Sequence, residues 1–174
     1  MDVTYLGENS IRVKGKTASI IIDPSPAVGK TETDAIALTD VILSPNLAKI
    51  EGYRIVINGP GEYEVSGVKI SGIKVEYKLV LRMEVDGVKV MVGDGLSVEK
   101  IHEKIEECDI AVINSENEYN YSILASLEPK ALLVFGSKKE NVAKFLGKEA
   151  GVKTTKYSAT SEKLPQEMEF VVLG

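Results

Sequence analysis

The spacing of hydrophobic residues along the chain changes at Gly93. Before this residue, apolar side chains recur at every second position in short runs, which is the period of half-buried β-strands. Turn signals separate the runs and predict hairpins at residues 58–73 and 78–92, the second around Asp86 and Gly87. After Gly93, stripes with helical spacing alternate with continuous apolar runs typical of buried strands. The pattern therefore predicts a first half that is mostly β and a second half of the α/β type.

The individual strands and helices follow from these runs. We expect strands at residues 3–6, 11–13, 18–22, 40–44, 54–57, 63–65, 68–70, 79–85, 88–92, 109–113, 131–135, 152–157 and 168–173, and a loop over residues 24–37. We expect helices at residues 97–108, 118–127 and 137–150, and no helix longer than two turns before residue 93. Ser97 can cap the first helix, and Ser137 with Glu140 has the spacing of a capping box at the third. This order predicts an α+β protein with two sheets packed face to face and helices outside.

Composition narrows the classes of protein to which the chain can belong. Its 174 residues suit one domain, and 44% apolar with 27% charged residues is typical of a globular protein. A net charge of −5 without a cluster of Lys and Arg argues against nucleic acid or an anionic membrane as the main partner. The sequence contains no signal-peptide pattern and no apolar run of membrane-spanning length, and its one cysteine excludes an internal disulfide. We therefore expect a cytoplasmic protein.

The supply of metal ligands is small. The chain has one histidine, His102, and one cysteine, Cys108, whereas a zinc site uses three or four ligands from His, Cys and carboxylates. His102 has Glu99, Glu103 and Glu106 as helical neighbours, so we expect a solvated surface histidine. A His-rich site for two metals cannot be assembled within this chain.

Residues 58–73, Asn-Gly-Pro-Gly-Glu-Tyr-Glu-Val-Ser-Gly-Val-Lys-Ile-Ser-Gly-Ile, carry a resemblance to a known family. They resemble the Gly-Glu-Tyr-Glu-Val-x-Gly-Val-x-Ile segment of the metallo-β-lactamase-fold hydrolases, in the branch of small members that includes the ascorbate-phosphate lactonases. The opening of the chain is similar to the family's Leu-Gly-His strand and hairpin, with Glu8 where the family often has histidine. The resemblance covers nearly the whole chain and implies one αββα four-layer sandwich domain over residues 1–174.

The same resemblance identifies three former ligand positions. The family's strand that ends in Ser or Thr opens into His-x-His-x-Asp-His, but here Ser44 is followed by Pro45 and Asn46, and the motif is absent. Asp94 matches the carboxylate that family members place between two metals, and Gly136 stands where they have a ligand histidine. The resemblance thus implies a degenerate member in which Asp94 is the one surviving ligand position. Judged by its neighbours alone, Asp94 is a turn aspartate that binds backbone N–H groups before a helix.

Two functions are compatible with this sequence. The first is a metal-free, non-catalytic protein that acts as a binding, regulatory or assembly module, because the core of the fold does not need the metal. The second is a metal-dependent hydrolase with an atypical carboxylate site around Asp94, binding Mg²⁺ or Mn²⁺ through oxygen atoms. Further carboxylates near strand ends are Asp23, Asp34, Asp40, Glu62 and Glu64. Ser44 and Ser115 lack a recognisable base partner. We favour the first function and expect no cofactor.

We expect the remnant of the family's site to form a shallow cleft at one edge of the sandwich. Its predicted residues are Ser44, Pro45, Asn46, Asp94 and Gly136. An unpaired buried carboxylate costs several kcal/mol, so Asp94 should accept hydrogen bonds from the turn at residues 95–97 or from the loop after Ser44. A small molecule or a protein partner should bind there. The resemblance further implies self-association, and we expect a homodimer.

Overall fold

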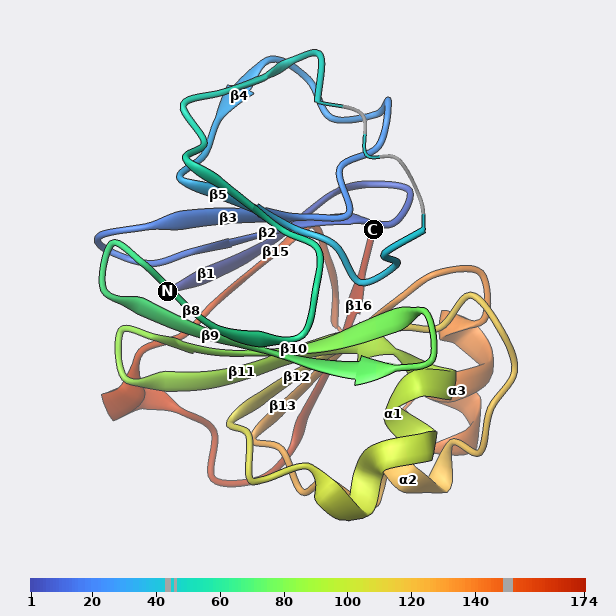
Figure 1. Ribbon diagram of the computed structural model, residues 1–174. Coiled ribbons are helices and arrows are strands. Elements are labelled where there is room, and N and C mark those ends of the chain that lie inside the picture. Colours follow the sequence, from blue (N-terminus) through green and yellow to red (C-terminus); the bar gives the residue numbers. More distant parts are fainter. Residues whose placement is uncertain (43–44, 46, 149–151) are drawn as a thin grey trace.

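Two facing β-sheets form the body of the protein (Figure 1). The computed structural model describes residues 1–42, 45, 47–148 and 152–174. Among these residues, one sheet has six strands in the order β15-β1-β2-β3-β5-β7, and the other has eight in the order β14-β16-β13-β12-β11-β10-β9-β8. The predicted α+β sandwich is confirmed.

The six-stranded sheet is built mostly from the first third of the chain. It contains β1 (Asp2–Gly7), β2 (Ser10–Lys14), β3 (Ser19–Ile22), β5 (Ala35–Ala37), β7 (Ile55–Ile57) and β15 (Lys156–Ser158). The pairs β15–β1, β1–β2 and β2–β3 are antiparallel, whereas β3–β5 and β5–β7 are parallel. Glu8 makes the tight turn between β1 and β2 with a φ of 52°.

The eight-stranded sheet combines a meander with a parallel half. The strands β8 (Gly61–Val65), β9 (Val68–Val75), β10 (Lys78–Val85) and β11 (Val88–Asp94) are antiparallel, while β11, β12 (Ile110–Asn114), β13 (Ala131–Phe135), β16 (Glu169–Leu173) and β14 (Val152–Thr154) are parallel. Asp86 and Gly87 have φ values of 53° and 77°, as a type I′ turn requires. The predicted hairpin around these two residues is confirmed.

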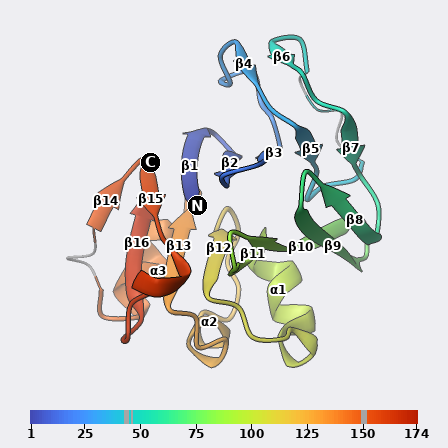
Figure 2. The same cartoon turned by 90° about the vertical axis from the view of Figure 1, so that its left-hand side faces the viewer.

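Alternation along the strands of the eight-stranded sheet supplies two separate cores. In β11, Val90 and Val92 point into the space between the sheets, while Met91 points outward beneath the helices. The helices α1 (Gly95–Ile101), α2 (Ser122–Ser126) and α3 (Lys139–Phe145) lie on that outer face, as Figure 2 shows. None of the described helices is both long and apolar enough to cross a membrane.

The outer face of the six-stranded sheet is covered without a helix among the described residues. A small sheet of β4 (Thr31–Glu32) and β6 (Ile50–Glu51) lies outside β3 and β5 in Figure 2. Together with the connecting segments it buries a third apolar cluster, formed by Ile21, Val28, Ile36, Leu38 and Ile50. This segment takes the place of the fourth layer that the family resemblance assigned to helices.

One strand lies elsewhere than predicted. We expected a strand at residues 40–44, but Asp40 makes only an isolated bridge, residues 41–42 form a turn, and Ile42 is 70% exposed. Residues 43 and 44 lie outside the described part of the chain. The strand that this part of the chain contributes to the six-stranded sheet is Ala35–Ala37, inside the stretch we had interpreted as a loop. Three small or β-branched residues between polar turns give too short a hydrophobic signal to be recognised.

The helices begin or end at residues other than those predicted. The N-cap of α1 is Asp94 rather than Ser97, and the helix ends at Ile101 instead of residue 108. The third helix lacks the predicted capping box, because Ser137 donates its hydroxyl hydrogen bond to the Glu116 carbonyl and Lys138 is the N-cap. Similarly, α2 is limited to Ser122–Ser126.

The predicted strand at residues 152–157 is divided between the two sheets. Its first part, β14, pairs with β16, and its second part, β15, pairs with β1. The chain crosses from one sheet to the other at Thr155, whose carbonyl accepts a hydrogen bond from the Tyr5 N–H at 2.8 Å.

The position of β5, in place of the strand predicted at residues 40–44, can be tested by comparing Ile36→Ala with Ile42→Ala. Ile36 is fully buried, so its truncation should lower the free energy of unfolding by about 2–4 kcal/mol. Ile42 is exposed, and its truncation should change this free energy by no more than about 0.5 kcal/mol. Urea denaturation of both variants measures the difference, and equal losses would contradict the assignment of β5.

Candidate functional site

The parallel register of three neighbouring strands brings candidate residues together where these strands end, at one edge of the sandwich. Asp94 ends β11 and pairs with Asn114 at the end of β12, which in turn pairs with Phe135 at the end of β13. Gly136 follows Phe135 directly. Asp94 and Gly136 therefore lie at the same edge, separated by the end of β12. Binding sites often form at such an edge, in the loops beyond the carboxyl ends of parallel strands.

The third predicted position is described only in part. Ser44 and Asn46 lie outside the described residues, and Pro45 is a half-buried residue without regular secondary structure. The residues just before them do reach this edge. The Val41 N–H donates a hydrogen bond to the Tyr77 carbonyl at 3.1 Å, and Asp40 forms a β-bridge with Lys78.

Asp94 is committed to the start of α1. Its Oδ1 accepts a hydrogen bond from the Ser97 N–H at 3.2 Å, and its Oδ2 accepts one from the Ser97 hydroxyl at 2.5 Å. The side chain is an N-cap, and the residue is only 6% exposed. The expectation that Asp94 would be paired within the turn at residues 95–97 is confirmed. Tyr119 closes this turn from outside, since a Cβ at Gly95 would lie 2.1 Å from its ring.

Lys78 joins two carboxylates at the same edge. Its Nζ lies 3.8 Å from Asp94 Oδ2 and 3.9 Å from Asp40 Oδ2, and its side chain is 25% exposed. The three residues come from the end of β11, the start of β10 and the segment after β5. Sequence reasoning did not select Lys78, because nothing in its local sequence distinguishes it from other lysines at strand ends.

Asp23 is a second enclosed carboxylate close to this group. It follows β3 with a φ of 47° and accepts hydrogen bonds from the Thr39 N–H, at 2.7 Å, and from the Thr39 hydroxyl. Burial raises the pKa of Asp23 to about 6, although the hydrogen bonds from Thr39 and the charge of Lys78 act in the opposite direction. The sequence-based interpretation of Asp23 as a turn residue agrees with this backbone conformation.

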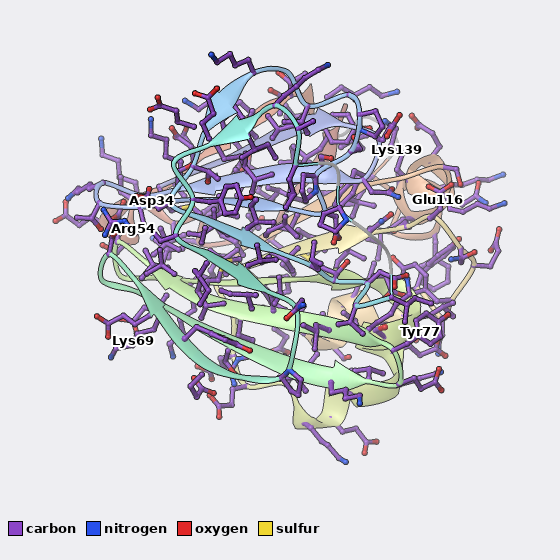
Figure 3. All side chains as sticks on the ribbon, turned by 45° about the horizontal axis from the view of Figure 1, so that its top comes forward. Asp34, Arg54, Lys69, Tyr77, Glu116 and Lys139 are labelled. Atoms are coloured by element: carbon purple, nitrogen blue, oxygen red, sulfur yellow. The ribbon has the colours of Figure 1, made fainter. Side chains whose placement is uncertain are left out.

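A row of cavities runs along the edge. A central cavity of about 170 Å³ is bordered by Glu8, Asn9, Asp23, Asp40, Lys78 and Asn114, among others. A smaller cavity of about 90 Å³ is also lined by Lys78, together with Asp94, Tyr77 and Leu96. A third, wider cavity is also lined by Glu8 and Asn9, together with Gly136. We call these three neighbouring cavities, which share lining residues, the edge cleft. Figure 3 shows Tyr77, Glu116 and Lys139, which border the cleft, on one side of the molecule, with Asp34, Arg54 and Lys69 on the opposite side.

Gly136 cannot carry a side chain without local rearrangement. Its φ is 98°, and a Cβ would lie 2.8 Å from Asn114 Oδ1 and 2.8 Å from the Ser115 carbonyl carbon. The Asn114 Nδ2 group donates a hydrogen bond to Asn9 Oδ1 at 3.2 Å. The position at which the family resemblance implies a histidine is therefore closed by backbone and by the Asn114 side chain.

The remaining candidates from the sequence do not line the edge cleft, although Ser115 lies next to Gly136. Asp34 Oδ2 accepts a hydrogen bond from the Ser19 N–H, and Ser115 Oγ lies 2.7 Å from the Tyr119 hydroxyl. Glu62 and Glu64 are exposed on β8. His102 Nδ1 lies 2.7 Å from the Glu99 carbonyl, in a 3₁₀ segment after α1. No serine–histidine pair is formed by these described residues.

The residues at the edge do not fit a transition-metal centre. Across residues 1–42, 45, 47–148 and 152–174, no three side chains from His, Cys, Asp and Glu are grouped as a metal would require. Two carboxylates, Asp40 and Asp94, converge at this edge, but both face the Lys78 ammonium, which repels a cation. Cys108 is buried, and burial raises its pKa to about 11, so it is a poor ligand and a poor nucleophile at neutral pH.

The raised pKa of Asp23 predicts a pH-dependent contribution to stability. Its pKa is about 6 in the folded state and near 3.8 in the unfolded chain, so the folded state binds more protons between these values. The contribution is fully present below pH 3.8 and is lost as the pH rises through 6. Asp23→Asn removes the titration, so the variant should gain about 2–3 kcal/mol relative to the wild type between pH 4 and pH 7.5. Denaturation of both proteins at the two pH values measures this, and a constant difference would contradict it.

Three alanine substitutions test whether the edge can accept a side chain at Gly136. Gly136→Ala combines a positive φ with contacts below 3 Å and should lower the free energy of unfolding by about 2–4 kcal/mol. Gly147→Ala has a φ of 64° in open space and should lose about 1 kcal/mol. Gly29→Ala has neither feature and should stay within about 0.5 kcal/mol of the wild type. A Gly136 variant no less stable than the Gly147 variant would refute the close contacts.

Comparisons with known proteins agree on the fold. No family profile and no curated protein matches the sequence. A candidate zinc-dependent hydrolase of the metallo-β-lactamase superfamily from Thermotoga maritima superposes with a TM-score of 0.80 at 21% identity, covering 99% of this chain and 98% of that chain. A candidate metal-dependent hydrolase from Parabacteroides distasonis superposes with a TM-score of 0.56 at 16% identity, covering 83% of this chain and 89% of that chain. The protein therefore has the metallo-β-lactamase fold.

Proposed function

We propose that this protein is a metal-free, non-catalytic protein of the metallo-β-lactamase fold that acts as a binding, regulatory or assembly module. The observation that carries the proposal is the state of Asp94, the family ligand position that this chain retains. Both carboxylate oxygens accept hydrogen bonds from Ser97, and the Lys78 ammonium lies 3.8 Å from Oδ2. A carboxylate engaged in this way stabilises the helix N-terminus and the cleft.

The composition of the chain and the shape of the edge support the same conclusion. The sequence has one histidine, and His102 lies in a separate segment after α1. Gly136 has no room for the imidazole that family members place there, because Asn114 and Ser115 occupy the space. The two ligand types that a zinc hydrolase needs at this edge, imidazole and an uncommitted carboxylate, are thus both replaced.

The edge cleft is the proposed binding site. Its central cavity of about 170 Å³ is lined mainly by hydrogen-bonding side chains, which suits a small polar molecule, and a loop of a protein partner is the other occupant compatible with it. The net charge of −5 disfavours nucleic acid and anionic membranes. We further propose a cytoplasmic homodimer, whose mass in solution light scattering would measure.

Elemental analysis tests the proposal directly. Protein purified without chelator should contain less than about 0.1 zinc, iron or manganese ion per chain, because the ligands of a tight site are absent. Added Zn²⁺ or Mn²⁺ should leave the melting temperature of the wild type unchanged. About one ion per chain, lost in Asp94→Asn while circular dichroism still shows a folded protein, would overturn it.

A carboxylate-based hydrolase is the second candidate, and one observation favours it. Asp40 and Asp94 lie within 4 Å of the same Lys78 atom, so two carboxylates from distant segments already converge. Hard cations such as Mg²⁺ bind through one or two carboxylates and keep several waters. Hydrolysis of ester or phosphoester substrates that depends on Mg²⁺ or Mn²⁺ and is lost in both Asp40→Asn and Asp94→Asn would establish this function instead.

A further inference from the structure

We propose that the Lys78 ammonium is the resident cation of the edge cleft, supplying from the chain itself the positive charge that holds Asp40 and Asp94 together. The inference rests on the proposed metal-free state and explains how the edge is stable in that state. Its starting point is the position of one nitrogen atom between two carboxylates from different parts of the fold, at 3.9 Å and 3.8 Å.

The backbone places Lys78 for this task. It is the first residue of β10, where it pairs with Val75 of β9 and forms a bridge with Asp40. Next to this bridge, the Leu79 N–H donates a hydrogen bond to the Thr39 carbonyl at 2.8 Å. These main-chain contacts hold the segment after β5 against the start of β10, so that Asp40 and Lys78 meet without relying on their side chains. The ammonium is then directed toward Asp94 at the end of β11.

The surrounding charges require a cation at this point. Glu8, Asp23 and Asp40 border the central cavity, and Lys78 is the one cation among the described residues that line it. Asp94 is 6% exposed and borders the adjoining cavity, which Lys78 also lines. Lys100 at that second cavity is engaged by Glu76 at 2.6 Å. Carboxylates that border the same and adjoining cavities repel one another unless a positive charge lies among them.

A lysine meets the requirement differently from a metal ion. The ammonium of the flexible lysine side chain is a compact charge. It pairs with carboxylates without a fixed coordination geometry. It is covalently attached, so the charge does not depend on a supply of metal. Removing the ammonium leaves Asp40 and Asp94 without the positive charge that they share, and a hard divalent cation with its own waters can take its place.

The experiment compares thermal unfolding with and without Mn²⁺ in the wild type and in Lys78→Met, which keeps the unbranched side chain up to the ε position and removes its charge. Lys78→Met should melt about 3–6 °C below the wild type without metal. Its melting temperature should rise with Mn²⁺, with half of the effect at roughly 0.1–1 mM, and electron paramagnetic resonance should detect bound Mn²⁺. Should Lys78→Met not fold, Lys78→Gln carries the same expectation.

Three control variants isolate the effect. Lys78→Arg keeps the charge and should respond to Mn²⁺ no more than the wild type. Lys100→Met also breaks a lysine–carboxylate ion pair, the one with Glu76, but leaves the Lys78 ammonium in place, so it should not acquire Mn²⁺ binding. Combining Lys78→Met with Asp94→Asn should abolish the Mn²⁺ response.

The possible failures of this inference and of the proposed function are distinguishable. A Lys78→Met protein that melts with the wild type, or one that is destabilised but does not bind Mn²⁺, would overturn the assignment of Lys78 as the resident cation. Stoichiometric binding of Mn²⁺ by the wild type, lost in Asp94→Asn, would instead overturn the metal-free function.

Discussion

Burial of the eight-stranded sheet on both faces is the constraint from which the rest of the architecture follows. One face of β10 and β11 packs against the six-stranded sheet through residues such as Leu81 and Val92, and the other packs against the helices through Val80 and Met91. Neither face can be left to water, so the second sheet and the helices must lie on opposite sides. Polar groups such as Asp94 and Asn114 lie where the parallel strands end, and the edge cleft is formed there.

The edge cleft is stabilised by contacts that serve structure and electrostatics together. Asp94 caps α1 through Ser97 and at the same time faces Lys78, which reaches Asp40 on the segment after β5. A helix N-terminus, a strand end and a loop are thereby linked around one carboxylate. In the proposed metal-free state, the N–H and the hydroxyl of Ser97 together with the Lys78 ammonium satisfy the charge of Asp94.

Similarity of fold and similarity of site are separable in this protein. Nearly the whole chain superposes on a candidate zinc-dependent hydrolase of the metallo-β-lactamase superfamily with 21% identity. The apolar alternation that maintains the two cores tolerates many exchanges of one aliphatic residue for another, whereas a metal site depends on a few particular side chains. The edge can therefore lose imidazoles at positions such as Gly136 while the sheets keep their order.

Local patterns in the sequence determined the hairpins, the change to α/β structure after Gly93 and the pairing of Asp94 with its own turn, because each depends on residues only a few positions apart. The sequence also indicated that Asp94 and Gly136 follow strands, and parallel order then places them at one edge. Only the tertiary structure decided that Ala35–Ala37 is a strand between β3 and β7 and that β14 and β15 belong to different sheets. It alone brought Lys78 between Asp40 and Asp94, because a contact between three distant segments is set by the packing of the sheets and leaves no periodic signal in the chain.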